Sequence, residues 1–133
     1  MNTEFFLAYD IRGLIDTELN DETAERIGRA FGTIIGGKPV VVGRDIRYSS
    51  GKIAPAFIRG LVSVGCSVTD IGECPSPVLF FNAFYLKQFG AVITASHNPA
   101  EYTGFKFVEP NGLSFLHQYE EMKRVYETGR FRS

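Results

Sequence analysis

The feature that most limits the possible folds is a repeated alternation of strand-like and helix-like segments. Short apolar or alternating runs are expected as strands, and amphipathic segments separate them as helices. The expected strands are residues 4–9, 40–43, 67–72 and 90–93, and the expected helices between them are residues 20–35, 51–64 and 78–87. Because helical crossovers join parallel strands, this order predicts an α/β fold, a three-layer α/β/α sandwich whose sheet is covered on both faces.

The alternation breaks after residue 95. Too few residues separate the run that ends at Ile93 from the next strand-like run, residues 104–108, for a parallel crossover, which needs about a dozen. That run is therefore expected to be antiparallel. The turn sequence at residues 109–112 predicts a hairpin with residues 113–115, followed by a helix over 117–128. The prediction is a mixed, mostly parallel sheet of about four strands plus a small hairpin.

Two of the predicted helices carry packing expectations. Gly28, Gly32 and Gly36 recur every four residues, and since interior glycines weaken a helix, we expect them to permit close approach of the helix to the sheet. The third helix is expected to be heavily buried because it carries large apolar side chains. These are Leu79, Phe80, Phe81, Phe84, Tyr85 and Leu86.

Composition narrows the functional classes. The 133 residues suit one domain spanning 1–133, and a net charge of −1 offers no basic excess for nucleic acid or an anionic membrane surface. Small molecules are the expected partners. Cys66 and Cys74 are in no metal-ligand spacing and are expected to be reduced, structural thiols. The N-terminal residues have neither the charge pattern nor the apolar length of a signal peptide or membrane span, so a cytoplasmic location is expected.

A polar segment follows directly on the apolar run 90–93. Ligands of open α/β sheets bind outside the carboxyl ends of strands, and Pro99 prevents the strand from continuing. Ser96 in this segment could be a nucleophile, an anion ligand or a turn residue. Serine hydrolysis is disfavoured because His97 is adjacent in sequence, where extended side chains diverge, and no Gly-x-Ser-x-Gly elbow is present.

Several cations could accompany this segment. Arg12 is expected in a turn after the first strand, where an arginine is ordinarily a solvated loop charge. Lys106 alternates away from its two phenylalanine neighbours, so it is either a solvated strand lysine or points toward Ser96. The loop 44–47 holds two arginines that could attract an anion or pair with Asp45 to shape the loop. Clustered cations around a hydroxyl suit phosphoryl transfer.

Three motifs carry a family resemblance. Thr-Ala-Ser-His-Asn-Pro at residues 94–99, followed by Glu-Tyr-Thr-Gly-Phe-Lys at 101–106, resembles the phosphoserine loop of the α-D-phosphohexomutases, the phosphoglucomutase and phosphomannomutase family. Tyr-Asp-Ile-Arg-Gly at 9–13 is similar to the family's N-terminal motif, and Pro-x-Pro at 75–77 to its helix entry. The resemblance covers essentially the whole chain, but only the first of the family's four domains.

The resemblance implies specific roles. Ser96 would carry a phosphate with Mg²⁺ on one of its oxygens, and would pass it to a hexose phosphate to give a bisphosphorylated sugar, which also acts as activator. Lys106 matches the proton-transfer residue, Arg12 and His97 match residues that orient and polarise the substrate, and Tyr9 matches a cleft neighbour. Tyr9, Arg12 and Lys106 would bind the substrate.

The later domains of the family are absent from this sequence. Their Asp-Gly-Asp-x-Asp metal loop, sugar-reading loop and phosphate clamp have no counterpart here, so the remaining Mg²⁺ ligands are expected from a domain not present. The fragment alone is expected to be inactive or nearly so. Its expected partners are the remaining mutase domains, or a second copy through an exposed apolar face. The alternative is a non-catalytic module of the same fold that binds phosphosugar or a partner subunit.

Overall fold

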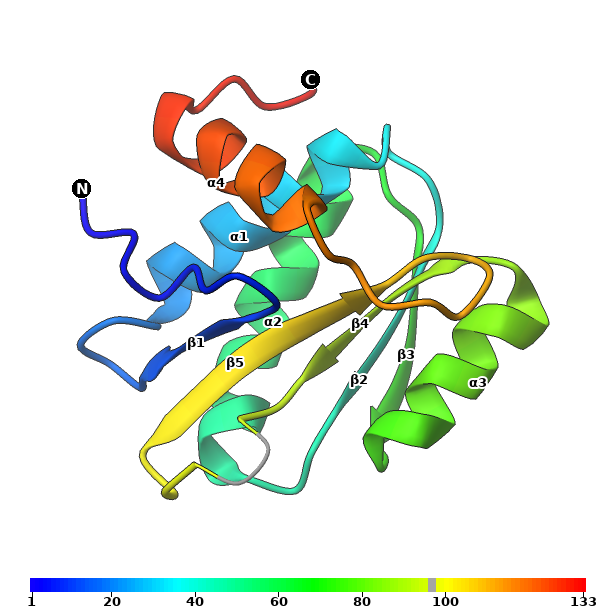
Figure 1. Cartoon of the computed structure of the whole chain (residues 1–133), viewed down its shortest axis with the longest axis horizontal. Coiled ribbons are helices and arrows are strands. Elements are labelled where there is room, and N and C mark those ends of the chain that lie inside the picture. Colours follow the sequence, from blue (N-terminus) through cyan, green and yellow to red (C-terminus); the bar gives the residue numbers. More distant parts are fainter. Residues whose placement is uncertain (96–97) are drawn as a thin grey trace.

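The computed structural model describes residues 1–95 and 98–133 and arranges them around one five-stranded mixed sheet (Figure 1). The strands, in their order across the sheet, are β1 (Ile11–Leu14), β5 (Tyr102–Val108), β4 (Phe89–Ile93), β2 (Val40–Arg44) and β3 (Val68–Glu73). β2 pairs in parallel with β3 and β4, whereas β5 runs antiparallel to both β4 and β1. The predicted α/β class, the mixed sheet and the reversal at β5 are confirmed, with five strands rather than about four.

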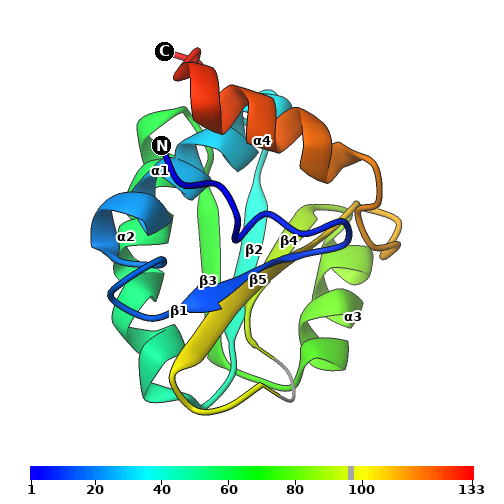
Figure 2. The same ribbon diagram turned by 60° about the vertical axis from the view of Figure 1, so that its left-hand side comes forward.

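Helices cover the two faces of the sheet unequally. One face carries α1 (Asp21–Ile34), α2 (Tyr48–Ser63) and α4 (Gln118–Thr128), while the other carries only α3 (Ser76–Leu86) (Figures 1 and 2). The three layers predicted from the sequence are therefore present, but the layer formed by α3 is a single short helix. In the part of the chain that the structure describes, no helix has the length and apolar character needed to cross a membrane.

The predicted first strand, residues 4–9, is wrong. This segment forms turns with one isolated bridge between Phe6 and Ile11, and the strand begins only at Ile11. Phe5 and Phe6 are buried, and their rings lie 5.7 and 5.3 Å from the ring of Tyr126 in α4. The aromatic run is thus explained by core packing, which favours the same residues as a strand does. Arg12 consequently lies inside an edge strand rather than in a turn.

The main core lies between the sheet and the three-helix face, and aromatic rings dominate its centre. The ring of Phe107 on β5 stacks on that of Phe31 in α1 with their centroids 4.3 Å apart, and Phe105 lies 4.8 Å from Phe57 in α2. The Phe107 amide donates a hydrogen bond to the Tyr119 hydroxyl of α4 (3.2 Å). These contacts fix β5 against all three helices. A smaller cluster on the other face joins the sheet to α3; its buried members are Val41, Leu79, Ala83, Val92 and Val108.

The first helix begins as predicted, but its glycines pack differently. The Asn20 side chain accepts a hydrogen bond from the Thr23 amide (2.9 Å), and the Thr23 hydroxyl accepts one from the Asn20 amide (2.8 Å), so both donors are capped. A Cβ atom on Gly28 would lie 2.3 Å from the carbonyl oxygen of Phe57 in α2. The predicted close approach to the sheet is therefore corrected: the small residue permits close approach of α1 to α2.

Three further predictions need adjustment. α2 begins at Tyr48, before the predicted start at residue 51, so Pro55 lies in the helix interior. The predicted hairpin after residue 112 is reduced to an isolated bridge between Val108 and Ser114. The heavy burial predicted for α3 is wrong, because only Leu79 and Ala83 are buried in that helix. One side of α3 faces the sheet, and the large side chains on its other side are mostly exposed.

Candidate functional site

The predicted site lies where two parallel strands end. β2 and β4 run side by side with Arg44 opposite Ile93, so their carboxyl ends meet at one edge of the sheet. The amide of Asp45 donates a hydrogen bond to the carbonyl oxygen of Ile93 (3.0 Å), which ties the two following loops together. Ser96 and His97, the two central predicted site residues, lie outside the described residues. On either side of them, the Asn98 amide donates a hydrogen bond to the Ala95 carbonyl (3.1 Å).

Arg12 reaches this loop from the N-terminal part of the chain. One terminal nitrogen, Nη1, donates a hydrogen bond to Oδ1 of Asn98 (2.5 Å), and Nη2 pairs with Oδ2 of Asp10 (2.5 Å). Asp10 is only 7% exposed, and the Arg12 side chain is 26% exposed. The guanidinium is therefore held by a nearly buried carboxylate and presented to the loop after β4, which excludes the freely solvated alternative.

Strand pairing places Lys106 on the same face of the sheet as Arg12. Arg12 lies opposite Gly104 across the β1–β5 pair, and Gly104 and Lys106 are two residues apart on one strand. Opposite residues of an antiparallel pair share a face, and so do residues two apart. Lys106 is partly buried and lies opposite Val92, which packs toward α3, so both cations are on the α3 side of the sheet. Tyr9 is 72% exposed in the turn just before Asp10.

The start of α2 holds the far side of the loop. The guanidinium of Arg47 donates hydrogen bonds to the carbonyl oxygens of Pro99 (2.7 Å) and Tyr102 (3.3 Å). The Ser49 hydroxyl donates to the Tyr102 carbonyl as well (3.2 Å). Arg47 also pairs with Asp45 (3.7 Å). For the loop 44–47, the structure thus supports the alternative in which Asp45 and an arginine shape the loop.

Sequence reasoning missed two residues that complete this arrangement, Asp10 and Asn98, and the main contact of a third, Arg47. Asp10 and Asn98 stand inside the two motifs quoted above, so the motifs themselves pointed to them, but the contact of Arg12 with Asn98 joins residues 86 positions apart in the sequence. Arg47 was considered only as an anion ligand or loop partner. Its bonds to residues 99 and 102 depend on how α2 meets the last strand, and no local pattern encodes that.

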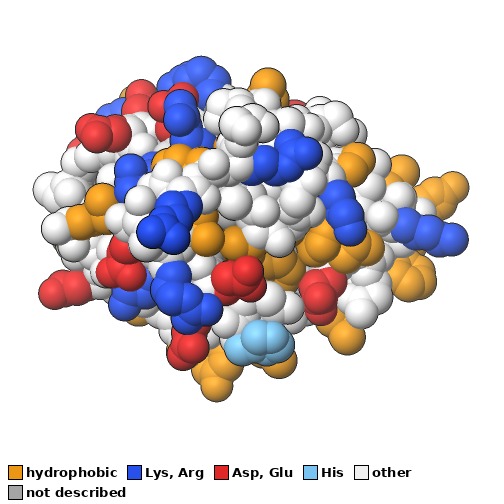
Figure 3. All heavy atoms as spheres, turned by 90° about the horizontal axis from the view of Figure 1, so that it is seen from above, with side chains coloured by type: hydrophobic (Ala, Val, Ile, Leu, Met, Phe, Trp, Pro, Cys, Tyr) orange, Lys and Arg blue, Asp and Glu red, His pale blue; other side chains and the backbone are white. Residues whose placement is uncertain are grey.

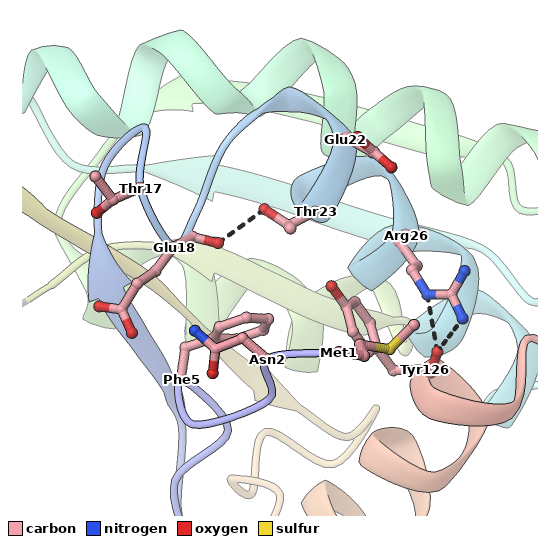
Figure 4. A pocket seen from close by; sticks show the side chains of 9 residues that line it. All are labelled: Met1, Asn2, Phe5, Thr17, Glu18, Glu22, Thr23, Arg26 and Tyr126. Atoms are coloured by element: carbon pink, nitrogen blue, oxygen red, sulfur yellow. Dashed lines mark hydrogen bonds between the residues drawn. The ribbon is translucent and has the colours of Figure 1, made fainter.

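A separate hollow of about 250 Å³ lies between the N-terminal segment, α1 and α4 (Figure 4). Its polar groups are engaged in holding the structure: Arg26 donates from Nε to the Tyr126 carbonyl (2.8 Å), and the Glu18 carboxylate accepts from the Leu14 amide (3.0 Å). None of the predicted site residues lines it. It is therefore separate from the site at the strand ends.

The described residues contain no group of three or more histidine, cysteine or acidic side chains that could hold a metal ion. The two cysteines are unpaired thiols, and burial raises the pKa of the Cys66 thiol to about 11. A thiol with a raised pKa is a poor nucleophile and a poor metal ligand, which agrees with a structural role.

The fold and the site together define a class: an α/β/α domain in which an arginine from an edge strand holds the loop that follows the central strand of a mixed sheet. Comparison with known proteins is more specific. The family profile described as "Phosphoglucomutase/phosphomannomutase, alpha/beta/alpha domain I" matches residues 3–132. The chain therefore belongs to the phosphoglucomutase/phosphomannomutase family, as its domain I.

Individual relatives agree with this assignment. The chain is 43% identical over 130 residues to a "Probable phosphoglucosamine mutase" of Thermococcus gammatolerans, covering 96% of this chain and 29% of that protein. It is 44% identical over 129 residues to a "Phosphomannomutase" of Klebsiella pneumoniae, covering 95% and 82%. A crystal structure of a phosphoglucomutase/phosphomannomutase family protein from Burkholderia thailandensis superposes with a TM-score of 0.88 at 35% identity, covering all of this chain and 32% of that one. The chain thus spans about three tenths of the length of the Thermococcus relative.

Proposed function

We propose that this chain is the phosphoserine-bearing domain of a phosphohexomutase, an enzyme that moves a phosphoryl group between the 1- and 6-positions of a hexose phosphate. The observation that carries the proposal is the hydrogen bond from Arg12 to Asn98, two residues after Ser96, at the carboxyl ends of the parallel strands. A cation fixed beside a hydroxyl-bearing loop is the arrangement that phosphoryl transfer requires. Family membership as domain I supports the same conclusion.

In this proposal Ser96 carries the phosphoryl group. The bond from phosphorus to the serine oxygen breaks as a bond to the sugar hydroxyl forms, which gives a bisphosphorylated sugar; after the sugar reorients, its other phosphoryl group returns to Ser96. Lys106 transfers the proton of the reacting hydroxyl, and Arg12 and His97 orient and polarise the phosphate. Arg12, Lys106 and the exposed Tyr9 contact the substrate. A bisphosphorylated hexose charges the serine and so acts as activator.

Mg²⁺ is proposed as the cofactor, resting on the phosphate of Ser96 and neutralising charge that builds up on its oxygens. The other ligands are proposed to come from a domain outside this chain, and the described residues contain no cluster of three or more metal-binding side chains. The remaining mutase domains are accordingly proposed as partners, alongside a second copy of the chain through an exposed apolar face. The cytoplasmic location stays a prediction from the sequence.

A second candidate is a non-catalytic module of the same fold that binds a phosphosugar or a partner subunit. It is supported by the same fixed cation, because a guanidinium held by Asp10 can bind a phosphate group whether or not Ser96 is phosphorylated. The two candidates differ in one observable, the presence of a phosphate on Ser96.

Mass spectrometry after incubation with glucose 1,6-bisphosphate tests the proposal. The wild-type sequence, Ser96→Ala and the matched control Ser114→Ala would be compared in the 133-residue chain and in a four-domain mutase that contains it. Phosphate on Ser96 in the longer protein, retained in the control and lost in Ser96→Ala, supports the catalytic proposal. No phosphate in either length would favour the non-catalytic module. Robust mutase turnover by the 133-residue chain alone would overturn the requirement for further domains.

A further inference from the structure

α3 is apolar around its whole circumference, but the sheet covers only one side of it. The segment Ser76–Leu86 contains no charged residue, and eight of its eleven residues are hydrophobic. A helix that is hydrophobic on all sides is normally buried on all sides. Here Leu79 and Ala83 are buried against the sheet, and most of the other large side chains face away from it.

The uncovered residues form one surface, which we call the α3 face. Its aromatic members are Phe81 (62% exposed), Phe84 (59%) and Tyr85 (66%), and the rings of Phe81 and Tyr85 stack with their centroids 6.0 Å apart. A Cβ atom on Gly112 would lie 3.4 Å from that of Phe84, so the loop after β5 adjoins the helix. The aliphatic members, from both segments, are Val78, Leu86, Leu113 and Leu116. In Figure 3 hydrophobic side chains gather at the end of the molecule where Figure 1 shows α3.

The size of the α3 face matches what a stable dimer needs. Three aromatic side chains of about 200 Å² each and four smaller ones, all roughly half exposed or more, leave on the order of 600–700 Å² of apolar surface. The largest apolar patch of a typical monomer is about 300–600 Å², and a standard interface buries about 800 Å² on each partner. The apolar area of the α3 face is therefore larger than that of most patches on monomers. It is close to the area that each partner of a standard interface buries.

The lack of charge along α3 suits a second copy of the chain as the occupant. In a twofold-symmetric dimer a surface packs on its own copy, so any charge on it meets the same charge. The helix of the α3 face is free of charge from Ser76 to Leu86, and two such helices that cross a twofold axis in antiparallel fashion also oppose their dipoles favourably. We propose that a second copy of this chain docks here, α3 against α3. This proposal is independent of the phosphoserine chemistry, and either can fail without the other.

Analytical ultracentrifugation of the 133-residue chain over a wide concentration range tests the proposal. We expect a reversible monomer–dimer equilibrium in the wild type, and at least about a hundredfold weaker association in Phe81→Lys/Tyr85→Lys, because two buried aromatic anchors become like charges. The matched control is Ile46→Lys/Tyr48→Lys, which changes two side chains that are each 83% exposed elsewhere on the surface. All these positions are exposed, so circular dichroism should report the same fold in every variant.

Charge exchange tests the symmetry. If α3 packs on α3, a mixture of Phe81→Lys and Phe81→Asp should form a heterodimer more readily than either variant forms a homodimer. A wild-type chain that stays monomeric throughout would overturn the proposal and leave the face to a different occupant, such as a further domain of a longer mutase. Association that survives unchanged in the double lysine variant would equally overturn it.

Discussion

The contact between α1 and α2 makes a sharp prediction about Gly60. A Cβ atom at this position would lie 2.1 Å from the carbonyl oxygen of Glu25 and 3.0 Å from the amide nitrogen of Arg29, both in the backbone of α1. Gly51, in the first turn of the same helix, is the matched control, since the nearest atom to its added Cβ would be Nε of Arg44 at 3.6 Å. The added methyl group would thus overlap the backbone of α1 at position 60, whereas at position 51 it would have only an ordinary van der Waals neighbour.

The expected energies follow from these distances. Replacing a helical glycine by alanine stabilises a helix by up to about 1 kcal/mol, and this gain applies to both variants. At Gly60 the helices must also move apart by about 1 Å, and forced overpacking of a core costs about 1–3 kcal/mol or more. Because the obstructing atoms belong to a helix backbone, we expect the upper end. Gly60→Ala should lose about 2 kcal/mol and Gly51→Ala should gain up to about 1 kcal/mol.

Urea unfolding followed by circular dichroism measures this difference. The proteins should be compared at one low concentration, so that association through the α3 face affects them equally. Gly28→Ala tests the same contact from the other helix, because its Cβ would lie 2.3 Å from the Phe57 carbonyl oxygen in α2. It should therefore be destabilising as well. Equal stability of Gly60→Ala and Gly51→Ala would refute the argument that glycine sets the separation of α1 and α2.

Three further predictions concern a cap, a thiol and the site. Asn20→Ala should lower the free energy of unfolding by about 1 kcal/mol in urea titrations, because it removes a reciprocal cap. Asn82→Ala, the control, should change it less, because the half-buried Asn82 only donates to a carbonyl oxygen within its own helix. Burial raises the pKa of the Cys66 thiol from 9.0 in the unfolded chain to about 11 in the folded one. As the pH rises from 9 to 11, the unfolded chain therefore loses this proton before the folded chain does, and the free energy of unfolding should fall. The fall, measured by urea titration, should be less steep in Cys66→Ala. Arg12→Lys should reduce phosphorylation of Ser96 in a full-length mutase at least about tenfold by mass spectrometry, because a lysine cannot bridge two partners as a planar fork.

The sheet was predictable from the sequence wherever a local rule decided the outcome. The short connection before residues 104–108 excluded a crossover, and β5 is indeed antiparallel. Local rules failed where two environments favour the same residues. Phe5 and Phe6 suit a strand or a core contact, and only their packing on Tyr126 distinguishes the two. The large side chains of α3 predict burial by sequence alone, but how much of a helix a sheet covers is a property of the assembled fold.

The candidate site was predictable in its residues but not in its connections. Arg12 was expected at the tip of a turn, where a guanidinium is free to point in any direction. The actual strand, β1, fixes it by pairing Arg12 with Gly104, and the backbone of Asp10 accepts a hydrogen bond from the Leu7 amide (2.9 Å), which shapes the turn that carries the carboxylate. Neither pairing is visible in the sequence, because each depends on a partner chosen by the whole sheet.

This dependence explains why the N-terminal segment matters to the site. The loop after β4 is held from one side by Arg12 and from the other by Arg47, and these residues reach it from an edge strand and from the start of a helix. β1 pairs only with β5 among the described strands, so a one-residue slip of that pairing would turn Arg12 to the opposite face, toward the aromatic core. The burial of Phe5 and Phe6 against α4 opposes such a slip, because it anchors the chain just before β1. The aromatic run that is not a strand therefore fixes the register of the strand that presents the arginine.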